Sequence, residues 1–299
     1  MIRITQEQRV AMMKRRVPCL DSFFDRITCL LWPRFKSILD LHLNSLRSTS
    51  LKVHKNKTGA DGCHVHYITR RYAELAASIL SLCNTPSACT RDKHAEELIL
   101  NQLALLRQEM VKVLIKMSSQ LDIFKNQLIF LINNYDIVLV IFTERKVVGE
   151  ENGKFEQLNK NTKRLYVEEE LDAFFHDLIT YVRPTLSVTV STLPSTNHQA
   201  ATPNEILEIS AIVTHFAATW KISMDTIHKN ILTSFSNFKN GTQILQEVLT
   251  QLLLYHTRLV DLIQTRIVSA SNDNTILQDM VTTQELWTEI KKYCHSFDE

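Results

Sequence analysis

The interval between Pro86 and Gly149 contains neither glycine nor proline, so nothing in it forces the chain to turn. Apolar residues recur through it at spacings of three and four, the period of one face of a helix. These residues are Ile99, Leu103, Leu106, Met110, Val113, Met117, Leu121, Phe124, Leu128, Leu131, Tyr135, Val138 and Phe142. Two strands would have no reason to keep the phase of an upstream helix. The pattern therefore predicts helix even for the strand-like run at 137–142.

The heptad-like seam has one stutter, at Ser118 and Ser119, where two spacings of four follow each other. A helix that ran unbroken from Ile99 to Phe142 would be roughly 65 Å long, since each residue adds about 1.5 Å. The pattern predicts that continuous seam and leaves a break at the two serines as the alternative.

The same interval holds the most apolar stretch of the chain, 127–142, but its middle is polar. The segment 133–136 (NNYD) divides it into apolar runs of five and six residues. A membrane-spanning helix needs about 20 consecutive apolar residues, so we predict a buried helix and no membrane span. The N-terminal residues lack the apolar core of a secretory signal, and the six cysteines follow no disulfide spacing. We expect a soluble intracellular chain with free thiols.

Glycine and proline are scarce throughout, with five and six in 299 residues, which favours a few long helices. The predicted fold is all-α, an elongated stacked bundle or rod of eight or nine antiparallel helices. A turn at 147–156 is predicted to divide it. Residues 1–146 would form a helical segment with a long helix hairpin, and residues 157–299 a C-terminal helical bundle.

Several helix boundaries follow from local signals. Pro33 is expected to kink or restart the first helix, and a later helix is expected to end before Pro184. Residues 202–205 (TPNE) form a capping box with proline at the first helical position, and residues 240–243 (NGTQ) give a second start signal. A last short helix carries Leu286 and Ile290. The three tryptophans lie on helical stripes and are predicted to pack in the core; they are Trp32, Trp220 and Trp287.

Charge gives no reason to expect nucleic acid as the main partner, because 34 Lys and Arg nearly balance 32 Asp and Glu. The basic runs at 14–16, 52–57 and 70–71 are short, and we interpret them as solvated faces or loops. Arg70 and Glu74 are spaced to pair across one helical turn.

We find no catalytic motif, no phosphate-binding glycine loop and no HExxH sequence. The run at 168–170 (EEE) is interpreted as a solvated helix face. Residues 61–66 (DGCHVH) carry metal-ligand side chains, but neighbours this close cannot close a tetrahedral site alone, so a flexible loop is the prediction. The chain is expected to be no enzyme, with no catalytic, cofactor-binding or metal-binding residues and no cofactor. An unrecognised all-α enzyme is the least favoured alternative.

Several segments, in order along the chain, carry a family resemblance. They are LLWPRFKSILDLHLNSLRS (30–48), HYITRRYAEL (66–75), QLIFLINNYDIVL (127–139), SFSNFKNGTQILQEVLTQLLLYH (234–256) and ELWTEIKKY (285–293). The chain resembles the C-terminal half of the vacuolar protein sorting-associated protein 52 family. The resemblance implies a helical rod of the tethering-complex (CATCHR-like) type. It places the chain beyond the family's N-terminal coiled coil.

The resemblance also implies a function. The family supplies a non-catalytic subunit of the Golgi-associated retrograde protein (GARP) and endosome-associated recycling protein (EARP) tethering complexes. These act in retrograde transport from endosomes to the trans-Golgi network and in endocytic recycling. The implied partners are the other GARP and EARP subunits, a Golgi Rab GTPase and SNARE proteins. The implied location is peripheral, through proteins, on the cytosolic face of trans-Golgi network and endosome membranes, and in the cytosol. The alternative is a stand-alone helical binding module, such as a small-GTPase effector.

Five polar residues are candidates for partner binding: Arg70, Arg71, Asn133, Asn134 and Asp136. The last three lie inside an apolar run, where they either satisfy backbone groups between crossing helices or form a specificity patch. The two arginines either make surface ion pairs or anchor an acidic partner, since arginine is favoured at interface hot spots. The sequence leaves both alternatives open.

Overall fold

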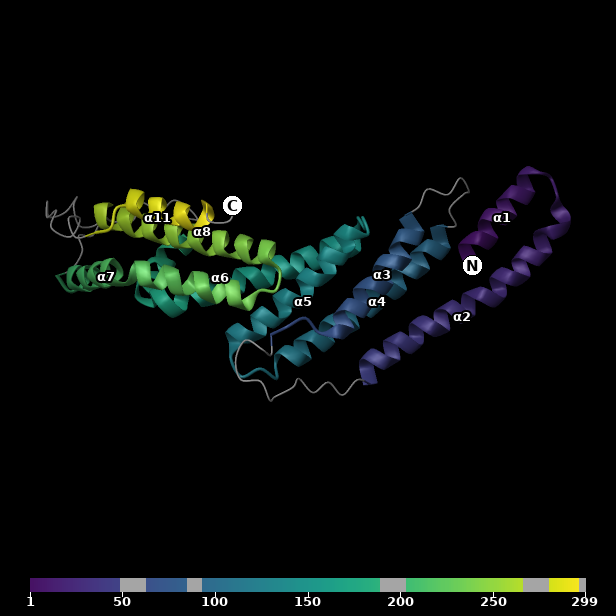
Figure 1. The fold of residues 1–299 in the computed structure, drawn as a ribbon, viewed down its shortest axis with the longest axis horizontal. Helices are drawn as coiled ribbons and strands as arrows, with labels where there is room; N and C mark the ends of the chain where they lie inside the picture. Colours follow the sequence, from purple (N-terminus) through teal and green to yellow (C-terminus); the bar gives the residue numbers. More distant parts are fainter. Residues whose placement is uncertain (49–62, 85–92, 189–202, 266–279, 296–299) are drawn as a thin grey trace. The chain divides into compact units, whose positions relative to one another are not determined.

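In the computed structural model the described residues are 1–48, 63–84, 93–188, 203–265 and 280–295. Every regular element in these ranges is a helix, and no strand occurs in them (Figure 1). The all-α prediction is confirmed, including residues 137–142, which are helical despite their β-branched side chains.

The chain divides into two compact units, Met1–Lys160 and Asn161–Glu299. Unit 1 contains α1 (Ile2–Lys14), the 3-10 helix η1 (Pro18–Leu20), α2 (Asp21–Ser48), α3 (Tyr67–Asn84), α4 (Lys93–Ser118), α5 (Phe124–Glu144) and the start of α6 (Glu150–Val188). Unit 2 contains the rest of α6, α7 (Pro203–Ser234), α8 (Phe238–Ile263) and α11 (Thr283–His295). The turn predicted at 147–156 is shorter than expected, because α6 already begins at Glu150.

The seam from Ile99 to Phe142 is not one helix, so the continuous version of that prediction is wrong. The chain turns between Ser118 and Phe124, at the stutter, and α5 packs back against α4. The hydroxyls of Ser118 and Ser119 donate to the carbonyls of Ile115 (2.9 Å) and Lys116 (3.0 Å). Serine competes in this way for the last backbone acceptors of a helix, which helps to end it. The hairpin lets both apolar faces share one core.

Two prolines lie inside helices. Pro33 is an interior residue of α2, and α6 continues past Pro184 to Val188, so the predicted end before Pro184 is wrong. Pro184 is exposed on the surface of α6. The irregular point of α6 is instead Phe175, whose φ of −130° and ψ of 34° are not helical. The Phe175 side chain is buried, and its ring centre lies 5.6 Å from that of Phe216 on α7.

The starts of α7 and α8 differ in how well local signals predict them. The helix α7 begins at Pro203, as predicted, although Thr202 lies outside the described residues. The start predicted at residue 240 is wrong, because α8 begins at Phe238 and both Asn240 and Gly241 are buried inside it. A Cβ atom on Gly241 would lie 3.7 Å from the Cβ of Phe235. That distance is an ordinary van der Waals contact, so the packing at this position does not require a glycine.

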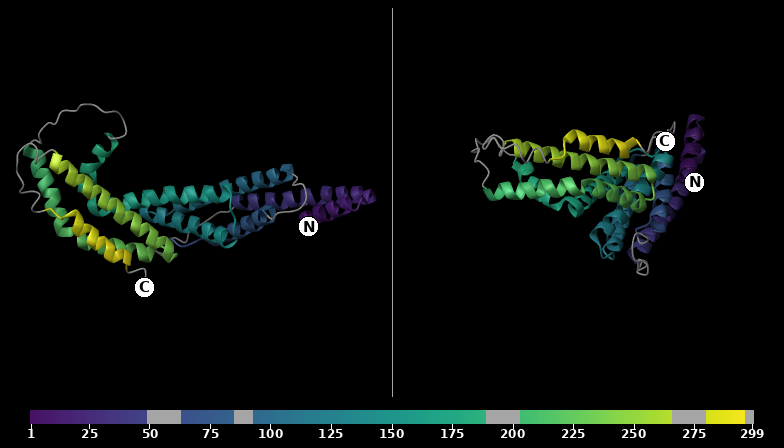
Figure 2. Two further views of the ribbon diagram at one scale, coloured as in Figure 1. Left: turned by 90° about the horizontal axis from the view of Figure 1, so that it is seen from above. Right: turned by 60° about the vertical axis from the view of Figure 1, so that its left-hand side comes forward.

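Unit 2 is a helical stack in which α8 packs against both α7 and α11 (Figure 2). The short connection at 235–237 makes α7 and α8 antiparallel neighbours. As predicted, α11 carries the buried side chains of Leu286 and Ile290. Trp220 is also buried as predicted, but Trp32 is half-buried and Trp287 is 46% exposed. The prediction of a core role is therefore wrong for Trp287.

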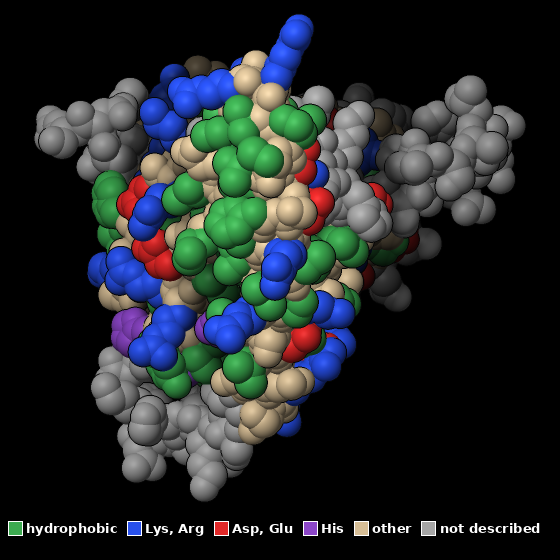
Figure 3. All heavy atoms as spheres, turned by 90° about the vertical axis from the view of Figure 1, so that its right-hand side faces the viewer, with side chains coloured by type: hydrophobic (Ala, Val, Ile, Leu, Met, Phe, Trp, Pro, Cys, Tyr) green, Lys and Arg blue, Asp and Glu red, His purple; other side chains and the backbone are tan. Residues whose placement is uncertain are grey.

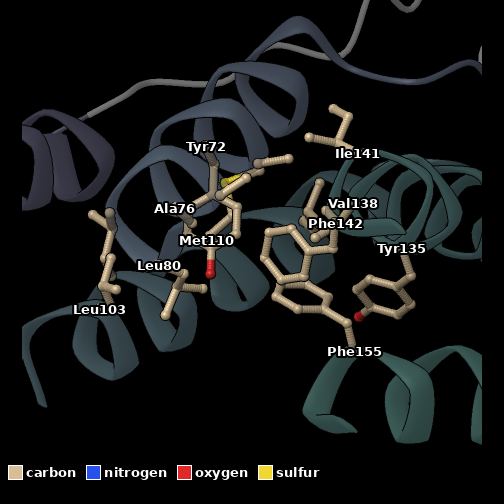
Figure 4. Close-up of a cluster of buried hydrophobic side chains, with 14 of the residues drawn as sticks. Tyr72, Ala76, Leu80, Leu103, Met110, Tyr135, Val138, Ile141, Phe142 and Phe155 are labelled. Atoms are coloured by element: carbon tan, nitrogen blue, oxygen red, sulfur yellow. The ribbon is translucent and has the colours of Figure 1, made fainter. Parts of the chain in front are cut away.

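The core of unit 1 centres on Phe155, from the first turns of α6 (Figure 4). Its ring lies 5.8 Å from that of Tyr72 on α3, 6.3 Å from that of Tyr135 and 6.1 Å from that of Phe142, both on α5. The helix α4 adds Leu103 and Met110 to the same cluster. Side chains from four consecutive helices thus share one cluster, in which the Phe155 ring lies beside rings of α3 and α5.

Helix α5 is, among the described residues, the one helix long and apolar enough to cross a membrane by length and composition. Most of its apolar side chains are buried within unit 1, together with Asn133 and Asn134. A core helix shows this pattern of burial, which supports the interpretation of 127–142 as a buried helix.

Candidate functional site

Asn134 is fully buried in the middle of α5 and uses its side chain to hold the start of α3. Its Oδ1 accepts hydrogen bonds from the backbone N–H of His66 (3.0 Å) and the hydroxyl of Thr69 (2.7 Å). Its Nδ2 donates to the carbonyl of Phe130 (2.8 Å). The first backbone N–H groups of a helix lack partners within it, so Asn134 helps to cap α3 from a distant helix.

Asn133 holds the residues that precede α3. Its Nδ2 donates to the carbonyl of Cys63 (3.0 Å), and the Cys63 thiol donates to the carbonyl of Asn126 (3.5 Å). We call residues 63–69 the strap. Both asparagines are hydrogen-bonded to it from α5. This burial and bonding support the structural alternative for Asn133 and Asn134 over an exposed specificity patch.

The strap contains Cys63, His64 and His66, three of the four residues with metal-ligand side chains in the segment 61–66. Cys63 is buried and His64 is exposed, while Asp61 and Gly62 lie outside the described residues. Within the described ranges, no group of three or more His, Cys, Asp or Glu side chains is placed to hold a metal ion. Residues 63–66 form a loop before α3, as predicted, and this loop is hydrogen-bonded to α5. Burial lowers the pKa of His66 and raises the pKa of the Cys63 thiol to about 11.

Alkylation by iodoacetamide at about pH 7.5 is expected to modify Cys63 at least 10-fold more slowly than Cys19 or Cys29. The thiolate is the reactive form, and Cys19 and Cys29 are exposed whereas Cys63 is buried with a raised pKa. Time-resolved peptide mass spectrometry measures each site separately, and the same reaction in denaturant is the control in which the rates converge. Equal rates for Cys63 and Cys29 in the native protein would contradict the burial of the strap.

Arg70 and Arg71 are exposed on α3, next to the strap. The guanidinium of Arg71 lies 5.5 Å from the ring centre of Tyr67, whose side chain is 61% exposed. The predicted pairing of Arg70 with Glu74 is wrong, because Glu74 pairs with Arg145 at 2.8 Å. A surface with arginine beside tyrosine has the composition of an interface hot spot.

The five candidate residues do not share one exposed surface. Asn133 and Asn134 are buried, Asp136 is half-buried on α5, and Arg70 and Arg71 are exposed on α3. Partner binding by these residues stays a prediction, and the exposed arginines with Tyr67 are the part that a partner can reach.

A buried ion pair joins α4 to the first turn of α6, and no local pattern predicted it. The Arg107 Nη1 lies 3.2 Å from the Glu151 Oε1, and the two side chains are 12% and 10% exposed. Burial raises the pKa of Glu151, and the nearby Arg107 offsets part of that rise. Burial also raises the pKa of Tyr72, and Glu151 adds to the effect.

Replacing Arg107 with leucine is expected to cost about 2 kcal/mol of folding free energy at pH ~7, because it leaves the Glu151 carboxylate buried and unpaired. The raised pKa of the Glu151 carboxyl makes the folded state bind more protons than the unfolded state at mildly acidic pH. The stability of the variant should therefore be closer to that of the wild type at pH ~5 than at pH ~7, because protonation of Glu151 removes its unpaired charge. Urea unfolding at both pH values measures the change in stability. Arg164→Leu is the control, because the Arg164 side chain is 83% exposed. A loss independent of pH would argue against the buried carboxylate.

In unit 2 a buried hydrogen bond joins α6 to α7. Glu170 is fully buried and accepts a hydrogen bond from Asn230 Nδ2 on α7 (3.2 Å). The interpretation of 168–170 as a solvated face is therefore wrong for Glu170. Glu168, in contrast, pairs at the surface with Arg164 (3.6 Å) and Arg183 (3.9 Å). The side chains of Asn134, Arg107 and Glu170 thus each connect two helices of the same unit.

The partners of these polar groups were missed by reasoning from the sequence alone. An Asn-Asn pair inside an apolar run signals that buried backbone groups need partners, and that signal was present in 127–142. The strap lies more than 60 residues away, and no local spacing pointed to it.

Comparison with known proteins gives a consistent result. The family model described as Vps52, C-terminal, matches residues 1–167. Vacuolar protein sorting-associated protein 52 A of Arabidopsis thaliana is 36% identical over 301 residues, which cover 99% of this chain and 39% of that protein. The human homologue is 31% identical over 288 residues, which cover 95% of this chain and 37% of that protein.

The match to the Schizosaccharomyces pombe protein is shorter, 28% identity over 163 residues, with 54% of this chain and 30% of that protein covered. No solved structure matches the chain. The chain spans about two fifths of the length of the Arabidopsis and human relatives. Because the family model covers more than half of the chain, and the Arabidopsis relative is 36% identical across 99% of it, the chain belongs to the Vps52 family and corresponds to its C-terminal part.

Proposed function

We propose that this chain is the C-terminal part of a non-catalytic subunit of a vesicle-tethering complex of the GARP and EARP type. Its role would be in retrograde transport from endosomes to the trans-Golgi network and in endocytic recycling. The observation that carries the proposal is the match to vacuolar protein sorting-associated protein 52 of Arabidopsis thaliana across 99% of the chain.

The chemistry of the interior supports a scaffold role. Asn134 caps α3, Arg107 pairs with Glu151, and Asn230 donates to Glu170, so these polar side chains join one helix to another. An enzyme instead directs a nucleophile, acid or base into a cleft where a substrate binds. Interior polar groups that link helices suit a protein that acts through its surface.

The proposed partners are the other subunits of the complex, a Golgi Rab GTPase and SNARE proteins. Recruitment to trans-Golgi network and endosome membranes would run through these proteins, because the whole chain has a net charge of only +2. We propose the exposed face with Tyr67, Arg70 and Arg71 as a contact for an acidic partner surface. Arginine held over an aromatic ring loses little conformational entropy on binding.

Affinity purification of the tagged chain from cells tests the proposal. Co-purification of the other tether subunits is expected, and the double variant Arg70→Glu, Arg71→Glu should reduce it at least 5-fold. The double variant Lys160→Glu, Arg164→Glu changes the same charge at exposed positions and is the matched control. Pull-down with the purified Rab, loaded with GTP or GDP, adds a nucleotide-dependent readout. Recovery of a GTPase without tether subunits would favour the stand-alone binding module instead.

A further inference from the structure

Helix α2 has two apolar faces, and unit 1 covers one of them. The inner face buries Phe24, Leu39 and Leu43, and α2 packs against α1 and α4. The outer face leaves four large apolar side chains in contact with solvent: Phe23 (54% exposed), Leu30 (69%), Ile38 (53%) and Leu41 (65%). Single exposed apolar residues are normal, but a row of them along one helix marks an interaction surface.

The spacing of the outer residues identifies the kind of partner. Phe23, Ile27, Leu30, Arg34, Ile38 and Leu41 follow one another at intervals of four, three, four, four and three residues. This is the a/d seam of a coiled coil with one stutter, and such a seam packs against another helix. We call these six residues the outer stripe. Its length corresponds to about five helical turns.

Residues 1–48, which include the outer stripe, carry a net positive charge. Residues 1–48, which hold α1 and α2, contain nine Lys and Arg against four Asp and Glu, a net charge of +5. The whole chain has a net charge of +2, so the remaining residues sum to −3. The net positive charge of the protein is therefore concentrated in residues 1–48, where α2 itself holds four Lys and Arg against three Asp and Glu.

Two of the four acidic side chains in residues 1–48 pair with arginines of α1. Asp25 pairs with Arg9 at 2.8 Å, and Glu7 pairs with Arg3 at 2.8 Å. Arg34 lies in the middle of the stripe, and Arg26 lies one helical turn before Leu30. Both arginines are exposed, and no carboxylate among the described residues pairs with either. Figure 3 views the side on which α1 and α2 lie and shows apolar side chains gathered there with many Lys and Arg around them.

We propose that the outer stripe of α2 docks an acidic amphipathic helix from another protein. The apolar face of that helix would pack on Leu30, Ile38 and Leu41, and its flanking carboxylates would pair with Arg26 and Arg34. This assignment rests on exposure, spacing and charge in α2, and it goes beyond the proposed function, since it holds whether or not the chain acts in a tether.

Two other occupants fit the outer stripe less well. A second copy of the chain would bring the exposed Arg26 and Arg34 of both chains to one interface, where like charges oppose association. A membrane-surface helix has a broad apolar face that lies in the lipid boundary, whereas the outer stripe is narrow and has Arg34 at its centre. A single partner helix of opposite charge satisfies both the apolar and the basic residues.

Binding of two designed peptides to the whole 299-residue chain tests the proposal. Both are helices of about 28 residues, with leucine at the a and d positions, and they differ only in having Glu or Lys at the flanking positions. Fluorescence anisotropy should show the Glu peptide binding at least 10-fold more tightly than the Lys peptide, with an affinity that falls as salt rises.

Two variants of α2 locate the binding. The double variant Leu30→Asp, Ile38→Asp should weaken binding of the Glu peptide at least 10-fold, and Ile222→Asp, at a 71% exposed position of α7, should leave it unchanged. Arg34→Glu should weaken the Glu peptide and strengthen the Lys peptide, which a loss of folding would not do. Circular dichroism checks that each variant keeps its helix content.

Three results would overturn the proposal. The first is equal binding of both peptides, or of neither. The second is attachment to vesicles of anionic phospholipid that the α2 variants abolish, while neither peptide binds. The third is a dimer, seen by analytical ultracentrifugation, that the same variants dissociate. Peptide binding is measured on the isolated chain, so its failure leaves the co-purification test of the tether role intact.

Discussion

Replacing Phe155 with alanine is expected to lower the free energy of unfolding of unit 1 by about 4 kcal/mol. The side chain has no exposed surface, and its ring meets those of Tyr72, Tyr135 and Phe142. The substitution removes the apolar surface of the ring and leaves a cavity that three aromatic side chains on rigid helices cannot fill. Aromatic pairs also contribute about 0.5–1.5 kcal/mol beyond the area that they bury.

Urea unfolding followed by circular dichroism measures this loss. Phe124→Ala is the matched control, because the same side chain at the start of α5 is 49% exposed and its removal should cost less than about 1 kcal/mol. Phe155→Leu should give an intermediate loss, since leucine fills part of the cavity. If Phe155→Ala and Phe124→Ala were equally stable, Phe155 would not be the centre of the core.

Replacing Asn134 with alanine is expected to cost about 3 kcal/mol, the second-largest effect among these predictions. Alanine would leave the His66 N–H and the Thr69 hydroxyl without the acceptor that they share in the native structure. The carbonyl of Phe130 would also lose a donor. An unsatisfied buried polar group costs about 1–3 kcal/mol, more than the net gain from a typical hydrogen bond.

Hydrogen exchange distinguishes this loss from a general destabilisation. The amide of His66 should lose protection by more than the global change in stability predicts, because its acceptor is gone. Asn44→Ala, at an exposed position of α2, is the control and should change stability by less than about 0.5 kcal/mol. Unchanged protection at His66 in Asn134→Ala would contradict the role of the strap.

The sequence by itself determined the class of fold and the family. Helical periodicity is a local property, set by which side of each turn is apolar, so a single chain displays it directly. It identified the helical state of 137–142 against its β propensity and the last helix with Leu286 and Ile290, while a capping box with proline marked the start of α7 at Pro203. It also marked the stutter at which α4 and α5 separate.

Only the tertiary structure decided which side chains meet. Asn134 reaches Thr69, Arg107 reaches Glu151, and Phe155 joins α3 and α5, all across long separations in sequence. Local signals also failed where tertiary packing buries a polar residue. Glu170 was predicted to lie on a solvated face and Asn240 to start a helix, yet both side chains are buried. Burial depends on which faces of distant helices come together, and a helical period does not specify that choice. The outer stripe of α2 belongs with these cases, since its periodicity is that of a core face and only the fold left it exposed.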